Sequence, residues 1–151
     1  MMKFKLPRRS LIALSLCASS MSLVWAQADF AQQAAKEPGA RVTASGLVFK
    51  SLQDGQGASP LASDKVKVHY RGTLPDGKEF DSSFKRNQPI DFPLNAVIPC
   101  WTEGVQLMRV GGKAKLTCPP AIAYGSRGAG GVIPPNATLQ FEVELIAIAG
   151  K

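Results

Sequence analysis

Short segments with a period of two residues recur along this chain and constrain its fold more than any other feature. In residues 65–71, Val66, Val68 and Tyr70 alternate with charged or polar side chains. Residues 113–118 and 138–148 alternate similarly, and residues 47–52 and 78–82 add two shorter segments. Successive side chains of a strand point to opposite faces, so this pattern predicts antiparallel strands with one buried face.

One helix is expected among these strands, over residues 99–108. Pro99 suits a first helical turn, and Trp101, Val105 and Met108 recur at helical spacing. Gly111 and Gly112 would end the segment. The fold class is therefore α+β, with a twisted antiparallel sheet and one short helix against its apolar face.

Two glycine- and proline-containing segments separate the predicted strands. Pro75-Asp76-Gly77 predicts a tight turn, because proline presets φ and glycine accepts a positive φ. Residues 119–136 are too rich in glycine and proline for regular structure. No internal repeat or second linker is present, so one domain is expected.

The first 26 residues have the pattern of a secretory signal peptide, with a basic start, an apolar run over residues 11–24 and small residues before the cleavage site. We expect cleavage after Ala26, with Ala28 as the alternative. A lipoprotein at Cys17 is less expected, because Leu16 precedes it. Residues 27–45 would form a flexible lead-in or a short helix, and residues 46–151 the domain. The expected location is the periplasm or the exterior, without stable membrane insertion after cleavage.

The positive charge of the chain is partly a property of this leader. Four of the 18 basic residues and none of the 11 acidic ones lie within it, so the net charge falls from +7 to +3 after cleavage. The remaining basic residues are scattered, which argues against nucleic-acid or membrane-surface binding.

Cys100 and Cys118 are the two cysteines that remain after cleavage. Exported proteins meet an oxidising compartment, so we predict a disulfide between them, which would stabilise the fold by roughly 3 kcal/mol in the chain-entropy model. Two buried free thiols are the alternative. The spacing is not that of a CxxC redox enzyme.

Six aromatic residues arrive singly, in different apolar segments. Rings gathered from separate segments would suit the wall of a concave apolar pocket, although each could be an ordinary core residue. The six are Tyr70, Phe80, Phe92, Trp101, Tyr124 and Phe141. Phe49 and Phe84 are expected outside this set, in the core and on the surface.

A set of ordered motifs resembles the FKBP-type peptidyl-prolyl isomerases. The motifs cover about residues 45–148 with family-like spacing, and together they are highly specific. They are Val68-His69-Tyr70-Arg71-Gly72, Asp76-Gly77-Lys78-Glu79-Phe80-Asp81-Ser82-Ser83, Val97-Ile98-Pro99-Cys100-Trp101-Thr102-Glu103-Gly104, Ala123-Tyr124-Gly125, Ile133-Pro134-Pro135-Asn136-Ala137-Thr138-Leu139 and Phe141-Glu142-Val143-Glu144-Leu145. The chain is similar to the catalytic domain of exported bacterial members of the macrophage-infectivity-potentiator type.

The resemblance implies a half-barrel of about five strands around one short helix, with a proline-binding pocket between them. Trp101 would form its floor, and the walls would be Tyr70, Phe80, Ile90, Phe92, Val97, Ile133 and Phe141. Asp81, Tyr124 and the backbone N–H of Ile98 would be the catalytic groups. The expected activity is peptidyl-prolyl cis-trans isomerisation during the folding of exported proteins, without a cofactor.

Departures from the family pattern refine these expectations. Cys100 stands where many members have glycine and Cys118 replaces an apolar residue, which supports the disulfide. Ile90 stands where some members carry phenylalanine, and Ala129 where some carry a bulkier polar residue. The long helical dimerisation domain of related exported proteins has no counterpart here, so a monomer is expected. The expected partners are proline-containing unfolded or nascent exported polypeptides and the macrolide inhibitors of the family.

Alternative functions carry less support. A folding chaperone that holds proline-containing segments with little turnover stays open, because the same apolar pocket serves both purposes. A hydrolase triad of His69, Asp81 and Ser82 is not favoured, since His69 is expected to be solvated on the polar face of its strand. Residues 125–131 lack the Gly-Lys-Ser/Thr ending of a phosphate-binding loop, and one histidine with two separated cysteines does not form a zinc set.

Overall fold

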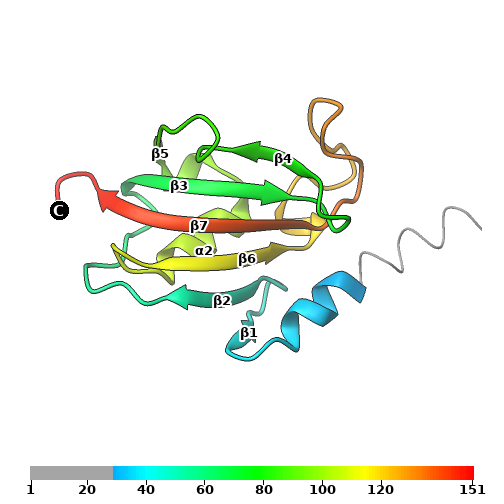
Figure 1. Ribbon diagram of the computed structural model, residues 1–151, viewed down its shortest axis with the longest axis horizontal. Helices are drawn as coiled ribbons and strands as arrows, with labels where there is room; N and C mark the ends of the chain where they lie inside the picture. The colour runs from blue at the N-terminus through cyan, green and yellow to red at the C-terminus, as the bar shows by residue number, and fades with distance from the viewer. Residues whose placement is uncertain (1–28) are drawn as a thin grey trace, which may run out of the picture.

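A seven-stranded antiparallel sheet forms the body of the computed structural model, which describes residues 29–151 (Figure 1). The expected signal peptide, Cys17 and the cleavage sites at Ala26 and Ala28 lie outside the described residues. The strand order is β1-β2-β6-β7-β3-β4, and β5 pairs with β3. The strands are β1 (Ala40–Val42), β2 (Val48–Gln53), β3 (Lys65–Thr73), β4 (Glu79–Ser82), β5 (Ile90–Pro93), β6 (Lys113–Cys118) and β7 (Leu139–Ile148).

The five segments predicted as strands correspond to β2, β3, β4, β6 and β7, with ends that differ by at most two residues. Alternation places one face of each long strand in the core, as expected. On β3 the buried residues include Val66, Val68 and Tyr70, and on β7 they include Leu139, Phe141, Val143 and Leu145. The predicted turn between β3 and β4 is present, with φ of 87° at Gly77.

Strands β1 and β5 were not expected from the sequence. β1 has three residues and β5 has four, too few to show a period of two. Pro93 ends β5, where a proline is tolerated because β5 pairs only with β3 and lies at an edge. Tertiary pairing, and not local pattern, therefore creates these two strands.

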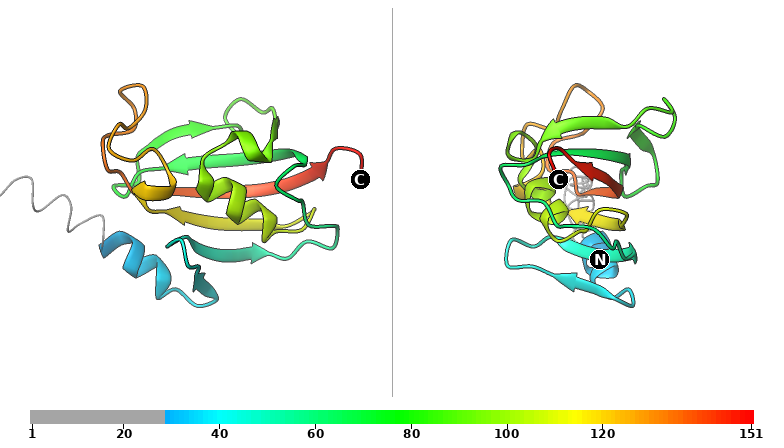
Figure 2. Two further views of the ribbon diagram at one scale, coloured as in Figure 1. Left: turned by 180° about the vertical axis from the view of Figure 1, so that it is seen from behind. Right: turned by 90° about the vertical axis from the view of Figure 1, so that its left-hand side faces the viewer.

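Helix α2 (Pro99–Gln106) crosses the apolar face of the sheet, as the view from behind shows (Figure 2). It begins at Pro99 as predicted and ends two residues early, so Met108 lies beyond the helix while remaining buried. Two short 3-10 helices, η1 (Leu94–Ala96) and η2 (Pro120–Ile122), precede α2 and follow β6. No helix among residues 29–151 is long and apolar enough to cross a membrane.

The helix approaches β6 closely because Gly104 has no side chain. A Cβ atom at Gly104 would lie 2.8 Å from Cδ1 and 2.9 Å from Cδ2 of Leu116. Leu116 is fully buried, so it has little room to move.

Gly104→Ala is expected to destabilise the protein by about 1–3 kcal/mol, because the added methyl group overpacks this contact. Urea unfolding monitored by circular dichroism measures the change. Arg109→Ala, at an exposed residue just beyond the same helix, is the control and should change stability by at most about 0.5 kcal/mol. Equal stabilities of Gly104→Ala and the parent protein would contradict the close-packing account.

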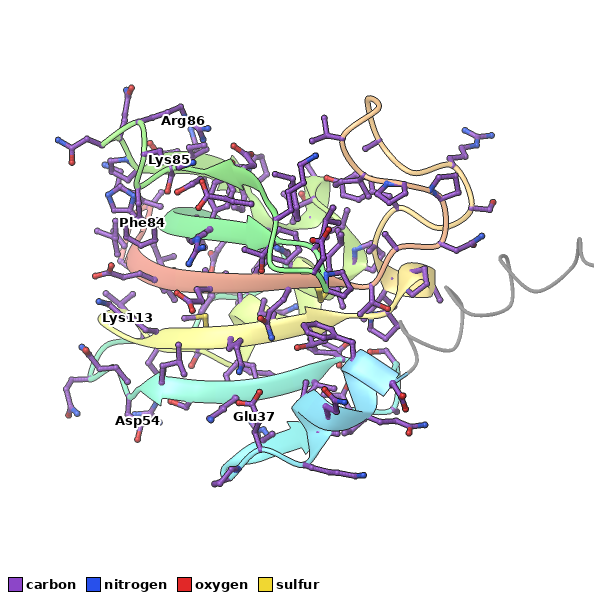
Figure 3. All side chains as sticks on the ribbon, turned by 45° about the vertical axis from the view of Figure 1, so that its right-hand side comes forward. Glu37, Asp54, Phe84, Lys85, Arg86 and Lys113 are labelled. Carbon is purple, nitrogen blue, oxygen red and sulfur yellow. A yellow bond between two sulfur atoms is a disulfide. The ribbon has the colours of Figure 1, made fainter. Side chains whose placement is uncertain are left out.

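The segment expected as a lead-in contains regular structure where it is described. Residues 29–35 are helical, and β1 pairs with β2. Glu37 joins this segment to the sheet, since its carboxylate accepts hydrogen bonds from Lys115 at 2.6 Å and Lys50 at 2.9 Å (Figure 3). Lys50 and Lys115 are cross-strand partners, so one carboxylate holds the end of this segment to two strands.

Glu37 makes the stability of the fold depend on pH, and the direction of its pKa shift gives the sign of that dependence. Hydrogen bonds from Lys115 and Lys50 lower the pKa of Glu37 from its usual 4.5 despite partial burial. A lowered pKa means that the stabilisation is present above the unfolded-state pKa and is lost as the pH falls through the folded-state value. We expect Glu37→Gln to cost about 0.5–1 kcal/mol at pH 7.

Urea unfolding of both proteins at pH 7 and at a pH below the folded-state pKa of Glu37 tests this contribution. The difference between Glu37→Gln and the parent should disappear at the lower pH. If the stability difference persists at the lower pH, it arises from packing and not from the ion pairs of Glu37.

Cys100 and Cys118 form a disulfide, with an S–S distance of 2.02 Å and a Cα–Cα distance of 5.8 Å. Both residues are fully buried. The bond links the first turn of α2 to the last residue of β6.

Candidate active site

An aromatic pocket of about 510 Å³ lies between the start of α2 and the sheet. Trp101 of α2 is buried in it, with 5% of its surface exposed. The surrounding residues come from β3, β4, β5, β7 and two connecting segments, between β5 and α2 and between β6 and β7. The lining residues are Tyr70, Phe80, Asp81, Ile90, Phe92, Ala96, Val97, Ile98, Trp101, Tyr124 and Phe141. Successive side chains of a strand point to opposite faces of the sheet, so the buried face that fills the core also contributes side chains to this pocket.

The pocket rings hold one another in fixed orientations. Trp101 packs edge-to-face against Tyr70 at 5.2 Å and against Phe141 at 5.3 Å. Phe92 lies 5.3 Å from Trp101, and Phe80 lies 5.6 Å from Phe141 in a further edge-to-face pair. These distances and angles are those at which aromatic rings attract each other. Trp101 therefore forms a rigid floor with aromatic walls on three sides.

Asp81 carries the charge at the rim of this pocket. Its Oδ2 accepts a hydrogen bond from the Tyr70 hydroxyl. Its Oδ1 accepts hydrogen bonds from Arg86 Nη1 at 2.6 Å and from the Ser82 N–H at 2.9 Å. Arg86 Nη2 also donates to the Tyr70 hydroxyl at 3.2 Å. The three side chains form a closed network that fixes the Tyr70 ring.

This network shifts the ionisation of its members. Burial raises the pKa of Asp81, but the hydrogen bonds from Tyr70 and Arg86 outweigh it and hold that pKa below 3.8. Burial, together with the hydrogen bond to Asp81, raises the pKa of Tyr70 above 10.0. At neutral pH the pocket therefore presents an ionised Asp81 and a protonated Tyr70.

Arg86 lies in the loop between β4 and β5, where Figure 3 shows it near Phe84 and Lys85. Lys85 forms an ion pair with Glu79 at 2.9 Å, and Arg86 forms one with Asp81 at 2.6 Å. Both acidic partners lie on β4. The loop is thus tied back to the strand that carries Asp81.

The polar groups at the pocket that have no hydrogen-bond partner among residues 29–151 include two N–H groups. One is the backbone N–H of Ile98, which immediately precedes α2. The other is the indole N–H of Trp101, which is buried. Tyr124, 40% exposed, places its ring at the rim. The Ile98 N–H is free to donate to a carbonyl group of a bound ligand.

Ten of the eleven residues that the sequence and the resemblance assign to the site line this pocket. Ile133 does not: it is 7% exposed and lines a separate hollow with Leu74 and Val132. Its backbone forms two reciprocal hydrogen bonds with Ala129. Phe49 is buried and Phe84 is 44% exposed, as expected.

Sequence reasoning missed Ala96 and Arg86. Ala96 ends η1 and lines the pocket without any chemical group that could have marked it. Arg86 is five residues after Asp81, and a basic residue at that spacing in a loop is not a recognisable signal.

His69 is not the solvated residue that its strand position suggests. It is half-buried, its Nδ1 lies 2.9 Å from Oγ of Ser83, and its ring stacks on Phe84 at 4.7 Å. Ser83 Oγ also accepts the N–H of Tyr70 at 2.7 Å. His69 therefore contacts Ser83 and not Ser82, and Asp81 bonds elsewhere, so these residues do not form a hydrolase triad.

A second hollow, of about 490 Å³, lies at the other end of α2 and includes Leu107 and Met108. Phe49 is its one aromatic ring, and the guanidinium of Arg41 covers it at 5.2 Å from the ring centre. This hollow lacks the ring cluster of the first pocket.

The sequence of residues 57–146 matches the family model described as "FKBP-type peptidyl-prolyl cis-trans isomerase". The chain belongs to this family. It is 58% identical over 114 residues to the FKBP-type peptidyl-prolyl cis-trans isomerase FkpA of Aeromonas hydrophila, covering 76% of this chain and 42% of the relative. It is 51% identical over 119 residues to the FKBP-type 22 kDa peptidyl-prolyl cis-trans isomerase of Escherichia coli K12, covering 79% of this chain and 58% of the relative.

Solved structures of the FKBP family share the fold. FkpA from Escherichia coli superimposes with a TM-score of 0.80 at 45% identity, over 86% of this chain and 60% of that one. A peptidyl-prolyl cis-trans isomerase from Pseudomonas syringae superimposes with a TM-score of 0.79 at 40% identity, over 89% of this chain and 98% of that one. The chain spans about half the length of the curated relatives it matches.

Proposed function

We propose that this FKBP-family chain catalyses the cis-trans isomerisation of X–Pro peptide bonds, with the prolyl ring held on Trp101. The observation that carries the proposal is the ring cluster around Trp101, with the unpaired N–H of Ile98 at its edge. The family membership and the relatives named as isomerases support the same activity.

The reaction needs no covalent chemistry, which suits the composition of this pocket. Rotation about a peptide bond has a barrier of about 18–20 kcal/mol, because resonance gives the C–N bond partial double-bond character. The twisted transition state has lost that resonance, so its carbonyl is less polar than that of the planar amide. An apolar pocket that excludes water favours the twisted state over the planar one.

Several polar groups at the pocket have a role in this proposal. The Ile98 N–H and the Tyr124 hydroxyl donate to substrate carbonyls and orient the peptide. Asp81 interacts electrostatically with the strained amide, while Tyr70 and Arg86 hold its carboxylate in place. Trp101 and Phe141 pack against the prolyl ring.

The proposed substrates are proline-containing unfolded or nascent polypeptides of an exported compartment, such as the periplasm. The leader pattern of residues 1–26 and the disulfide of Cys100 and Cys118 support this location, because disulfides persist in oxidising compartments. The macrolide inhibitors of the FKBP family are proposed to occupy the same pocket and to compete with substrate.

A protease-coupled assay on a short X–Pro peptide tests the activity. Without catalyst the cis form converts in tens to hundreds of seconds, and we expect that rate to increase in proportion to the concentration of added protein. An uncatalysed rate in the presence of protein that binds the peptide would overturn the proposal in favour of a folding chaperone without turnover.

A further inference from the structure

The start of α2 presents a free backbone donor and lacks a side-chain cap at its N-terminus. Ile98 occupies the N-cap position, with no side-chain capping hydrogen bond and no acidic residue in the first turn. In a capping box, a Glu or Gln at the third helical position would accept the N–H of the N-cap residue. That position is Trp101 here, so the Ile98 N–H stays available.

The disulfide reaches this same uncapped turn. Cys100 lies two residues after Ile98 and immediately before Trp101. Cys118 ends β6, and the chain runs from it through η2 to Tyr124, six residues later. One covalent bond therefore joins the turn that carries the Ile98 N–H to the strand that leads to Tyr124.

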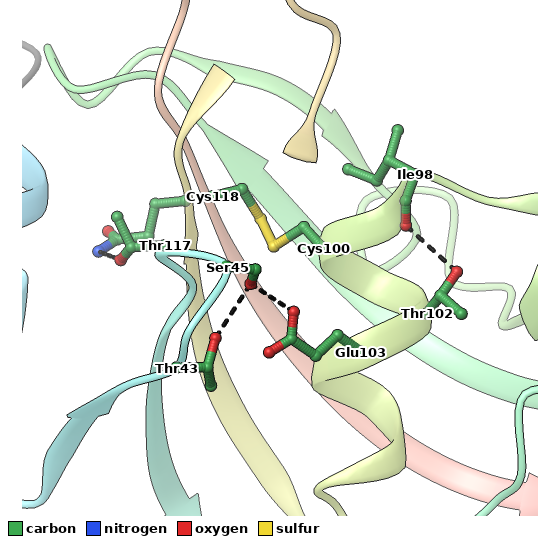
Figure 4. The surroundings of a disulfide bond; sticks show 9 residues. Thr43, Ser45, Ile98, Cys100, Thr102, Glu103, Thr117 and Cys118 are labelled. Carbon is green, nitrogen blue, oxygen red and sulfur yellow. Dashed lines mark hydrogen bonds between the residues drawn. A yellow bond between two sulfur atoms is a disulfide. The ribbon is translucent and has the colours of Figure 1, made fainter. Parts of the chain in front are cut away.

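The first turn of α2 is also held without covalent bonds, because Trp101 packs on Tyr70 and Phe141 of the sheet. The Thr102 hydroxyl lies 3.5 Å from the Ile98 carbonyl, and a further tie lies at Glu103 (Figure 4). The Thr102 hydroxyl donates to the Leu94 carbonyl at 2.7 Å, and the Ser45 hydroxyl donates to Glu103 at 2.5 Å. The second turn rests on β6 through Gly104 and Leu116. Cys100 is thus the residue of the first turn that anchors it covalently to the sheet.

We propose that the Cys100–Cys118 disulfide is a positioning device for catalysis that takes the place of an N-terminal cap. It holds the first turn of α2 on β6 without consuming the Ile98 N–H, and it fixes that donor relative to Tyr124. The inference rests on the proposed isomerase function, because it assigns these two groups to substrate carbonyls. It predicts weaker substrate binding without the disulfide, beyond any loss of stability.

The test compares the full chain with its Cys100→Ala/Cys118→Val variant, which keeps the site apolar and removes the cross-link. We expect KM for an X–Pro peptide to rise roughly 3- to 10-fold, the equivalent of one lost hydrogen bond, with kcat changed by less than about two-fold. Met108→Ala is the matched control, because Met108 is buried just beyond the opposite end of α2. It should lower stability and leave KM unchanged.

Amide hydrogen exchange gives a readout that is independent of catalysis. The N–H groups of Trp101 and Thr102 both donate to the Ile98 carbonyl and report on the first turn. They should exchange faster in the cysteine variant, whereas in Met108→Ala the N–H of Leu107, bonded to Gly104, should exchange faster.

Reduced wild-type protein covers the case in which the variant does not fold. A dithiol reductant transfers two electrons to the disulfide during unfolding, leaving two thiols and the oxidised reductant, and the chain is refolded without oxidant. The same rise in KM is expected. An unchanged KM and unchanged first-turn exchange in an active protein would overturn the positioning role, whereas an inactive parent protein would overturn the proposed function.

Discussion

Trp101→Ala should lower kcat/KM for an X–Pro peptide by roughly 10- to 150-fold, because the prolyl ring loses the apolar contact worth about 1.5–3 kcal/mol. The same change should destabilise the fold by about 3–5 kcal/mol, since Trp101 contacts Tyr70, Phe92 and Phe141. Both quantities are measured on one preparation, by the peptide assay and by urea unfolding, at a temperature at which the variant is folded.

Phe49→Ala separates the two effects of the tryptophan change. Phe49 is also a buried aromatic residue, 6% exposed, but it lies on β2 and outside the pocket. The Phe49→Ala protein should lose about as much stability as Trp101→Ala and keep the kcat/KM of the parent protein. A Trp101→Ala protein that is folded and retains the parent kcat/KM would remove Trp101 from the substrate-binding surface.

The second large effect is expected from Asp81→Asn, which keeps the shape of the side chain and removes its charge. Tyr70 and Arg86 would lose their ionised acceptor, and the amide would lose its electrostatic partner, so kcat/KM should fall about 10-fold, or about 1.4 kcal/mol. Asp91→Asn, at an exposed residue of β5, is the control and should leave the rate unchanged.

The pH dependence of the Asp81 contribution has a definite sign. Its pKa lies below 3.8, so the carboxylate is ionised throughout the neutral and mildly acidic range. The rate advantage of the parent over Asp81→Asn should be constant above pH 5 or so and shrink as the pH falls through the folded-state pKa. If the rate advantage of the parent protein changes around neutral pH, a titrating group other than Asp81 is responsible for it.

The long strands follow from local sequence, whereas the pocket walls were expected from the resemblance to the FKBP family. Alternation identifies β3 and β7 because each is long enough to show its buried face, and the ordered motifs bring Tyr70, Trp101 and Phe141 to one site. β1 and β5 are too short for such a pattern, and their pairing depends on neighbours that are remote in the sequence.

The connecting segments are where sequence reasoning fails, because their paths depend on tertiary contacts. Ile133 was expected in the pocket, but it lines a neighbouring hollow, and its backbone forms reciprocal hydrogen bonds with Ala129. Arg86 was not expected there, but its long side chain folds back from its loop to Asp81. His69 contacts Ser83 and Phe84 for the same reason, because the loop after β4 covers its strand face.

The central claim is that the pocket turns over prolyl bonds and does not merely bind them. Exchange spectroscopy by NMR on an X–Pro peptide at equilibrium, with the protein at about one-hundredth of the peptide concentration, tests it directly, because uncatalysed exchange takes tens to hundreds of seconds. The account predicts cross-peaks between the cis and trans resonances with the parent protein, and their loss with Trp101→Ala. Peptide binding without such cross-peaks in the parent protein would contradict it.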